Sequence, residues 1–232
     1  YPAFRIPTVC IPASIDNNLP GSELSIGTDT ALNVIVEAMD KIKESGIASR
    51  RCFVVETMGR DCGYLALMSG IAAGAERIYT NEDGISLDDL ANDVHWLRES
   101  FAHGRRLFLA VRNENASHNY TTDFIARLLE EESHGMYDVR QVVLGHMQQG
   151  GSPSPFDRLL ANRLGYRALN LIDDELAAHQ DGSWFIGVNE SGMRPCSMDT
   201  MPSLIDAAHR RPREQWWLQL RTIARMVSDE VR

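Results

Sequence analysis

The sequence contains no apolar run that approaches the roughly 20 residues needed to cross a bilayer, so no membrane partner is expected. Its first ten residues, YPAFRIPTVC, show neither a basic leader nor a small-residue cleavage pattern. We therefore expect a cytoplasmic protein. The chain begins with Tyr1 rather than Met, and a strand-like run follows almost at once, so we interpret it as a piece of a longer protein.

Cysteine is scarce, and the cysteines that are present stand singly. Cys10, Cys52, Cys62 and Cys196 form no CxxC pair and have no metal-ligand spacing. Isolated cysteines of this kind are more often reduced thiols in a core than disulfide or zinc ligands. The sequence therefore predicts neither a disulfide framework nor a metal site.

Positive charge is also in short supply, because 23 Lys and Arg face 32 Asp and Glu, for a formal net charge of -9. General nucleic-acid binders hold the phosphate backbone with clustered Lys and Arg, so nucleic acid is not an expected partner. An anionic ligand would need a local basic pocket. Hydrophobic residues, in contrast, make up 44% of the 232 residues, enough for one sizeable core or two small lobes.

Short apolar runs rich in β-branched residues alternate with helical patterns, which predicts an α/β fold with a parallel sheet and crossover helices. The expected strands are 8–12, 52–56, 107–112, 141–144 and 184–188. The expected helices are 30–44, 63–75, 87–101, 122–132, 155–176 and 214–229. We expect one compact unit over residues 1–232, since the linker-like stretch 178–183 is too short to mark a domain boundary.

Ligands of open parallel sheets bind beyond the carboxyl ends of the strands, so the residues after each run are the site candidates. The first run is followed by SIDNNLPG at 14–21, which combines a hydroxyl, a carboxylate and two amides. Taken alone, an Asx-rich turn explains it equally simply. The second run is followed by MGRDCGY at 58–64, where glycines permit close backbone approach and Arg60 can donate two hydrogen bonds to a phosphate. Amides at the start of the next helix would add to this anion-binding character.

Two further strand ends add polar groups to the same edge. The third run ends in Arg112, Asn113 and Glu114, and the fourth in GHMQQGG at 145–151. These residues supply a carboxylate, an imidazole and amides, although His146 taken alone is also explained as a structural histidine.

Two arginines stand at the opposite edge. Arg51 and Arg140 come just before the second and fourth runs, where a neighbouring subunit's site would be their natural target. A solvated or helix-capping role explains each of them equally well.

Three segments in order, IPASIDNNLPGSELSIGTDTALN, VVETMGRDCGYLALMSGIAAGAE and LGHMQQGGSPSPFDR, resemble ATP-dependent 6-phosphofructokinases. The resemblance runs from about Pro7 to the end of the chain. NYTTDFI at 119–125 and REQWWLQLR near the C-terminus resemble the eukaryotic-type enzymes in particular. The chain is thus identified as the sugar-phosphate-binding, C-terminal portion of such an enzyme.

This resemblance implies two α/β lobes with the sugar phosphate between them, and transfer of a phosphoryl group from MgATP to the 1-hydroxyl of fructose 6-phosphate. It assigns Asp16 as the base that accepts the hydroxyl proton, Glu114 as an acceptor for sugar hydroxyls and His146 as a ligand of the distal phosphate. Arg51 and Arg140 match arginines that cross a subunit interface, which implies a homo-oligomer. The expected substrate-binding residues are Ser14, Ile15, Asp16, Asn17, Asn18, Arg51, Met58, Gly59, Arg60, Glu114, Arg140, His146, Met147, Gln148 and Gln149.

Two positions depart from the catalytic pattern. Asn18 stands where catalytic members usually have a second Asp that helps to organise magnesium between phosphates, and Gln149 stands where they usually have an Arg. The GHMQQGG sequence is typical of the C-terminal halves of eukaryotic enzymes, which have become regulatory pockets for fructose 2,6-bisphosphate. A catalytic segment, a regulatory binding module and a segment with only a structural role all remain open.

The family's glycine-rich ATP loops precede the region that matches this chain. We therefore expect Mg²⁺ and ATP to serve the parent enzyme but not to bind well to this segment alone. ATP and pyrophosphate are distinguished mainly in that upstream region, so pyrophosphate remains a minor alternative as donor.

Overall fold

The computed structural model describes residues 6–46 and 49–229. Its tertiary contacts group into two units, with Tyr1–Thr30 and Ser152–Trp216 in unit 1 and Ala31–Gly151 and Trp217–Arg232 in unit 2. The sequence favoured a single compact unit, and the linker-like stretch 178–183 lies inside unit 1 rather than at a boundary. The chain passes between the units three times, because segment 31–151 builds its own sheet and core and the chain returns to that unit after Trp216.

Unit 2 is built on a parallel sheet with the strand order β3-β4-β2-β5. Its strands are β2 (Arg51–Thr57), β3 (Arg77–Tyr79), β4 (Leu107–Asn113) and β5 (Asp138–Val143). Its helices are α1 (Thr28–Gly46, whose first turn belongs to unit 1), α2 (Tyr64–Ala73), α3 (Leu87–Ala102), α4 (Thr122–Glu132) and α7 (Arg221–Asp229). The α/β class and the parallel sheet are confirmed.

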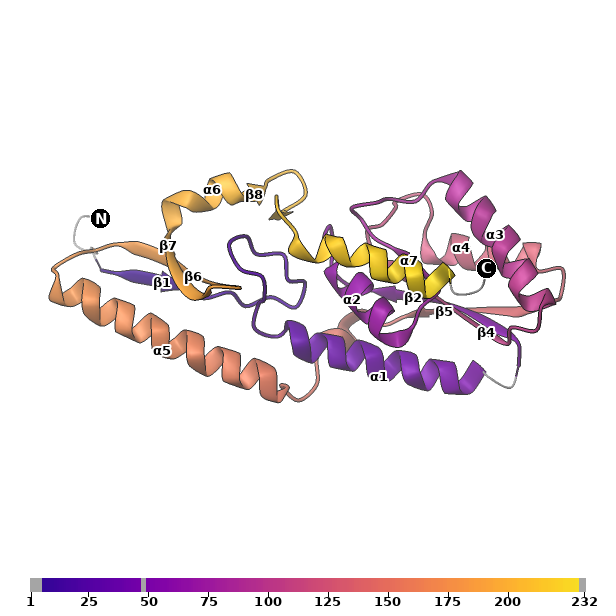
Figure 1. Ribbon diagram of the computed structural model, residues 1–232, viewed down its shortest axis with the longest axis horizontal. Coiled ribbons are helices and arrows are strands. Elements are labelled where there is room, and N and C mark those ends of the chain that lie inside the picture. The colour runs from indigo at the N-terminus through magenta and orange to yellow at the C-terminus, as the bar shows by residue number, and fades with distance from the viewer. Residues whose placement is uncertain (1–5, 47–48, 230–232) are drawn as a thin grey trace. The chain divides into compact units, whose positions relative to one another are not determined.

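Helices cover both faces of this sheet (Figure 1). Alternate residues of β2 and β4, such as Cys52 and Phe108, pack with α3 and α4 in one buried cluster. The intervening residues, such as Phe53 and Leu109, are equally buried on the other face, where α2 packs on β3 and β4. Burial on both faces explains why these strands read as continuous apolar runs.

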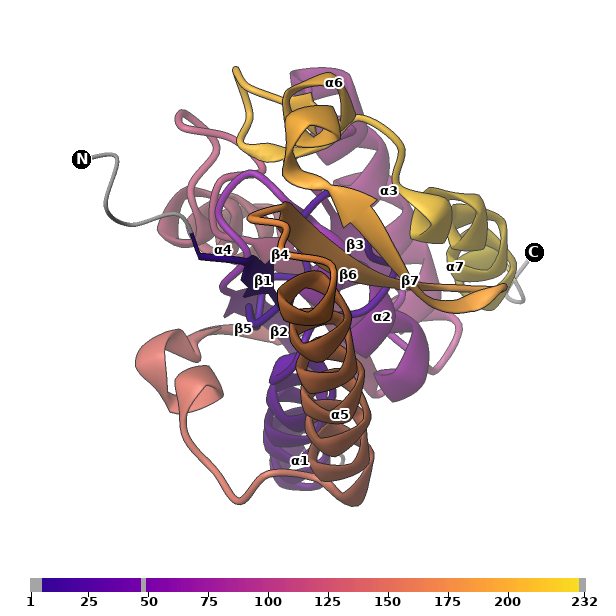
Figure 2. The same cartoon turned by 90° about the vertical axis from the view of Figure 1, so that its left-hand side faces the viewer.

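Unit 1 has a smaller sheet with the order β1-β6-β7. Strand β1 (Thr8–Cys10) pairs in parallel with β6 (Ser183–Asn189), and β7 (Gly192–Ser197) pairs antiparallel with β6. Helix α5 (Pro155–Ala177) lies along one side of the sheet, and Leu164 and Ile186 meet in the core between them (Figures 1 and 2). The rest of unit 1 comprises η2 (Met198–Thr200), α6 (Met201–Leu204) and the short pair β8 (Ile205–Asp206) and β9 (Arg211–Pro212).

The sequence missed β3 and β7, and it placed the last helix too early. Strand β3 has three residues, too few for a periodic pattern, and Pro195 argued against β7, which tolerates it as an edge strand. Pro212, just before the expected helix 214–229, lies in β9. The stretch after it forms the 3-10 turn η3 (Trp216–Leu220) before α7 begins at Arg221.

Arg140 was expected just before a strand, which is wrong, because it is the third residue of β5 and lies opposite Phe53. The polar start of β5 is tolerated because β5 is an edge strand of the sheet. Within the described residues we find no helix with both the length and the apolar character of a membrane span.

Candidate functional site

Three loops meet at the carboxyl edge of the unit 2 sheet, because β4, β2 and β5 are neighbours in it. The last residues of β2 and β4, Thr57 and Asn113, lie directly opposite each other, and Glu56 lies opposite Val143 of β5. The turn at 58–62, the segment that starts at Glu114 and the 3-10 helix η1 (Gly145–Gln149) therefore start side by side. The sequence predicted that these strand ends converge. It also placed the loop after β1 at the same edge, which is wrong, because β1 belongs to the other sheet.

The turn after β2 requires glycine at position 59. Gly59 has a φ of 130°, and an added Cβ would lie 2.4 Å from the Cys62 carbonyl oxygen and 2.9 Å from Asn113 Nδ2. The turn is closed by the Cys62 amide, which donates to the Gly59 carbonyl at 2.8 Å. Arg60 follows with a φ of 49°, in the left-handed region. No residue with a side chain fits the first of these positions without moving its neighbours.

Two side chains hold the backbone amides of this turn in place. Gln148 Oε1 accepts from the Met58 amide at 3.1 Å, and Glu114 Oε1 accepts from the Arg60 amide at 2.8 Å. Gln148 is 1% exposed and also donates to the Gly145 carbonyl at 2.9 Å, so both its side-chain oxygen and its side-chain nitrogen bond to backbone groups of the protein. Gln148 and Glu114 were predicted as ligand-binding residues, and both brace the turn in the structure.

The turn and η1 leave several predicted side chains accessible. Arg60, His146, Met147 and Gln149 are exposed at the carboxyl edge of the unit 2 sheet. These side chains supply a guanidinium, an imidazole and an amide beside a rigidly held turn. A guanidinium and an imidazole can each donate hydrogen bonds to an anion.

The sequence also predicted that amides at the start of α2 would face an anionic ligand, and for the Gly63 amide this is wrong. The Gly63 amide donates to both carboxylate oxygens of Glu82, at 3.0 and 3.1 Å. A protein carboxylate therefore occupies this helix start, where negative charge is favoured.

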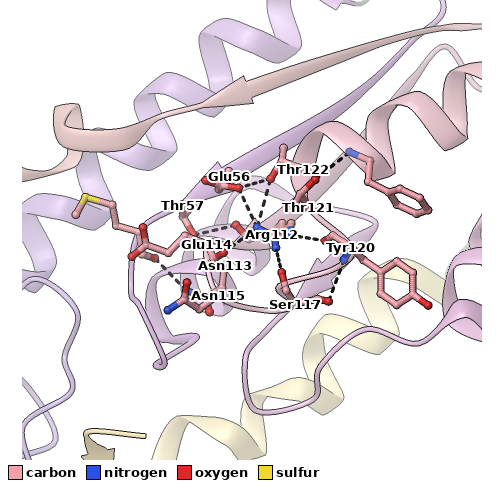
Figure 3. Close-up of polar contacts among 12 residues, drawn as sticks. Glu56, Thr57, Arg112, Asn113, Glu114, Asn115, Ser117, Tyr120, Thr121 and Thr122 are labelled. Carbon is pink, nitrogen blue, oxygen red and sulfur yellow. Dashed lines mark hydrogen bonds and ion pairs between the residues drawn. The ribbon is translucent and has the colours of Figure 1, made fainter.

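Arg112 anchors the loop after β4 and lies at the centre of its polar contacts (Figure 3). Its guanidinium donates to the Glu56 carboxylate at 2.9 Å and to the backbone carbonyls of Glu114, Ser117 and Tyr120 at 3.0, 2.6 and 3.2 Å. Burial lowers the pKa of the Arg112 guanidinium, and the neighbouring Glu56 carboxylate opposes that shift. One signal in the sequence pointed to this role, namely an arginine at the end of an otherwise apolar strand.

A second set of predicted residues lies in unit 1, in the loop after β1. Ser14 Oγ donates to Asn18 Oδ1 at 2.9 Å across the loop, and Thr28 Oγ1 donates to the Ser14 carbonyl at 2.7 Å. Asn17 has a φ of 53° and is 3% exposed, and its amide donates to the Glu23 carbonyl at 2.7 Å. Asn17 therefore shapes the loop from inside.

Asp157 secures the far end of this loop, a role that the sequence did not predict. Its carboxylate accepts from the Gly27 and Thr30 amides, both at 2.8 Å, and from Thr30 Oγ1 at 2.5 Å. Its own amide is capped by Ser154 Oγ at 3.1 Å. The only sequence signal was the spacing of Ser154 and Asp157, which also reads as an ordinary helix start.

Two further predicted residues, Arg51 and Arg140, lie away from the carboxyl edge of the unit 2 sheet. Arg51 is the first residue of β2, at the amino end of the strand, and its Nη1 donates to the Ser45 carbonyl at 3.3 Å. Arg140 lies in β5, donates to the Val139 carbonyl at 2.7 Å and leaves much of its side chain exposed. The structure thus places neither arginine with the predicted residues at the carboxyl ends of the strands.

Residues 2–172 match the family model described as Phosphofructokinase. The chain belongs to the phosphofructokinase family. The curated relatives include ATP-dependent 6-phosphofructokinases, namely the platelet type of Rattus norvegicus, 42% identical over 98% of this chain, and the muscle type of Homo sapiens, 44% identical over 96%. This chain spans 30% of the length of each of these relatives.

Solved structures give the same assignment. The phosphofructokinase of Saccharomyces cerevisiae has a TM-score of 0.94 at 36% identity, covering 100% of this chain and 32% of the yeast chain. The Pichia pastoris phosphofructokinase in the T-state has a TM-score of 0.91 at 36% identity, covering 98% of this chain and 28% of that one. A pyrophosphate-dependent phosphofructokinase from Marinobacter aquaeolei, at 17% identity and a TM-score of 0.66, covers 93% of this chain and 59% of its own and shares the fold. The phosphofructokinase fold expected from the sequence is thereby confirmed.

Proposed function

We propose that this chain is the sugar-phosphate-binding part of an ATP-dependent 6-phosphofructokinase, whose complete form transfers the γ-phosphoryl group of ATP to the 1-hydroxyl of fructose 6-phosphate. Relatives with that name match nearly the whole chain. The observation that carries the proposal is the turn at 58–62, where Gln148 and Glu114 hold the Met58 and Arg60 amides and Arg60 remains exposed.

Arg60 is the proposed ligand of the anionic group. A guanidinium donates to two phosphate oxygens at once, and the fixed backbone below Arg60 reduces the ordering that binding requires. His146 adds a second group at the end of β5, assigned by the resemblance to the distal phosphate of the sugar. Met58, Gly59, Met147 and Gln149 complete the proposed contacts in unit 2.

Asp16 is the proposed base, in the unit 1 loop whose shape depends on Ser14, Asn17 and Asn18. A base in this position takes the proton of the sugar hydroxyl as the phosphoryl group arrives. Phosphoryl transfer depends mainly on positioning and charge neutralisation, so a rigid loop suits the role.

The parent enzyme is proposed to use Mg²⁺ with ATP. Among the described residues there is no group of three or more His, Cys, Asp or Glu side chains that could hold a metal ion. Magnesium in such sites is commonly bound by one or two carboxylates together with the substrate phosphates. The residues that the structure describes do not by themselves fit a complete metal site, and we assign no step to a metal held by them.

A second candidate function is an allosteric module that binds fructose 2,6-bisphosphate. Asn18 and Gln149 favour it, because each replaces a charged residue of the catalytic pattern with an amide. The contact from Ser14 Oγ to Asn18 Oδ1 also commits that amide oxygen to the loop itself. In this alternative the parent remains a phosphofructokinase oligomer, and Arg51 and Arg140 serve the site of a neighbouring subunit.

Calorimetric titration of the complete gene product with fructose 6-phosphate, fructose 2,6-bisphosphate and MgATP tests the proposal. Arg60→Ala should weaken binding of the sugar phosphates by at least tenfold, as expected for a lost charge-assisted contact. Arg127→Ala is the matched control, because Arg127 is exposed on α4 and pairs with Asp123. Preference for the bisphosphate would favour the regulatory alternative, whereas equal binding by Arg60→Ala and Arg127→Ala would contradict the proposed site.

A further inference from the structure

The indole of Trp216 and the amide of Asn17 share one hydrogen-bond acceptor. Trp216 Nε1 donates to the Glu23 carbonyl oxygen at 3.0 Å, and Asn17 Nδ2 donates to the same oxygen at 2.7 Å. All three residues belong to unit 1, although Trp216 is far from the other two in the sequence. One oxygen atom therefore links the end of unit 1 to the loop that carries Asp16.

Asn17 depends on this contact for its orientation. Its side chain is buried, its backbone is in the left-handed region, and its Oδ1 is buried with no hydrogen-bond donor among the described residues. The bond from Nδ2 to Glu23 is thus what fixes the amide. Because Asn17 stands between Asp16 and Asn18, its orientation bears directly on both neighbours.

The Glu23 carbonyl is itself held by the sheet of unit 1. The Glu23 amide donates to the Val188 carbonyl at 2.7 Å, and the Val188 amide donates to Ser22 Oγ at 3.0 Å. Residues 22 and 23 are therefore hydrogen-bonded to β6, while Asn17 and Trp216 both donate to the Glu23 carbonyl.

The two adjacent tryptophans have different environments. Trp217 is 2% exposed and packs edge to face on Tyr64 with ring centroids 5.7 Å apart, as a core residue does. Trp216 is 37% exposed, and its ring lines a cavity of about 380 Å³ together with Gly21, Ser22 and Glu23. Packing alone does not account for a half-exposed indole whose N–H is directed at a loop carbonyl.

We propose that Trp216 is a positioning residue for the loop at 14–18, acting through the Glu23 carbonyl and Asn17. Its indole N–H keeps this carbonyl turned toward Asn17, and Asn17 in turn keeps Asp16 and Asn18 in place for the sugar phosphate. This role rests on the proposed function, because the position of the loop matters in this way only if the protein binds a sugar phosphate.

Trp216→Phe in the complete gene product removes the N–H and keeps an aromatic ring. Trp184→Phe is the matched control, because Trp184 also lies in unit 1 and its buried Nε1 has no acceptor among the described residues. The measurements are kcat and KM for fructose 6-phosphate with MgATP, and the calorimetric Kd for fructose 6-phosphate and fructose 2,6-bisphosphate. Trp216→Phe should lower kcat/KM or weaken binding about tenfold, since small displacements of reacting groups have large effects, while Trp184→Phe should stay within about twofold.

A double-mutant cycle with Asn17→Ala separates positioning from general destabilisation. If Trp216 acts through Asn17, the effect of Asn17→Ala on kcat/KM or Kd should be at least about threefold smaller in Trp216→Phe than in the unaltered protein. In the Trp184→Phe background the effect of Asn17→Ala should be unchanged.

Two results would overturn the role and can be told apart. In the first, the unaltered protein has normal activity or binding, but Trp216→Phe behaves like Trp184→Phe or its effect adds to that of Asn17→Ala. This result would contradict the role of Trp216 and leave the proposed function in place. Absence of both turnover and sugar-phosphate binding in the unaltered protein would remove the proposed function, and the role of Trp216 with it.

Discussion

Arg112 and Glu56 face each other across the register of β4 and β2 and form an ion pair of 2.9 Å. The side chains are 2% and 21% exposed, respectively. The same guanidinium donates to the Glu114 and Ser117 carbonyls in the loop that follows β4. The ion pair therefore connects the interior of the unit 2 sheet to its carboxyl edge. This support extends to the turn at 58–62, because Glu114 in the loop after β4 accepts a hydrogen bond from the Arg60 amide.

Arg112→Ala should lower the free energy of unfolding by about 3–5 kcal/mol, since it leaves a partly buried carboxylate and several carbonyls without their donor. Urea denaturation measures the change. Arg127→Ala, which breaks an exposed pair with Asp123 on α4, should alter the free energy by no more than about 0.5 kcal/mol. Equal effects of the two substitutions would show that the Arg112 contacts contribute little.

Gly59→Ala should distort the turn at 58–62, because the new Cβ would meet the Cys62 carbonyl at 2.4 Å in a backbone conformation with φ of 130°. We expect at least tenfold weaker sugar-phosphate binding, measured by calorimetry, since the Met58 and Arg60 amides would leave their partners. Gly104→Ala is the control, because Gly104 has a φ of 99° with open space around it. It should cost about 1–2 kcal/mol in unfolding free energy from backbone strain alone and leave binding intact. Unaltered sugar-phosphate binding by Gly59→Ala would show that the turn at 58–62 does not contribute to the binding site.

Glu76 should make stability depend on pH in the direction opposite to that of a typical ion-paired carboxylate. Burial raises the pKa of the Glu76 carboxyl above its usual value of 4.5, against the opposing hydrogen bonds from the Leu109 amide and Arg105. A carboxyl with a raised pKa binds more protons in the folded state than in the unfolded state. Its contribution to the free energy of unfolding is therefore complete below pH 4.5 and is lost as the pH rises through its pKa in the folded state.

Glu76→Gln removes this titration while keeping an acceptor oxygen. The free energy of unfolding of the unaltered chain, minus that of the variant, should therefore fall as the pH is raised from 4 to 7. Urea denaturation at each pH measures the difference, and Glu37→Gln on the exposed side of α1 controls for loss of a surface charge. A difference that rises with pH would show that the Arg105 contact dominates over burial.

Strands β2 and β4 were predictable because they are buried on both faces and form continuous apolar runs, and the long helices were predictable from their regular apolar spacing. Asp157 shows where the sequence stops being informative. It holds the Gly27 and Thr30 amides from 130 and 127 residues away, and no local pattern encodes a contact of that length. Gln148 illustrates a related problem, because an amide in a ligand-binding motif can turn either outward or into the backbone. Only the tertiary arrangement shows that it accepts from the Met58 amide.

Asp16→Asn distinguishes the two proposed functions of the site most directly. If Asp16 is the base, the isosteric amide should lower kcat of the complete gene product by about 10²-fold or more and leave fructose 6-phosphate affinity nearly unchanged. If the site is regulatory, turnover without effector should persist, and the response to fructose 2,6-bisphosphate should change instead. Asp88→Asn, in the exposed first turn of α3, makes the same chemical change away from the loop and should do neither.

Asn18→Asp extends this test in the opposite direction. An aspartate can still accept the hydrogen bond that Ser14 Oγ donates to Asn18 Oδ1, so the loop should keep its shape while the site gains one negative charge. In a catalytic site this charge should strengthen the Mg²⁺ dependence of turnover, because carboxylates bind magnesium better than amides do. In a regulatory site it should repel the bisphosphate and weaken its binding. If Asp16→Asn and Asn18→Asp both leave turnover and effector response unchanged, the unit 1 loop has neither role.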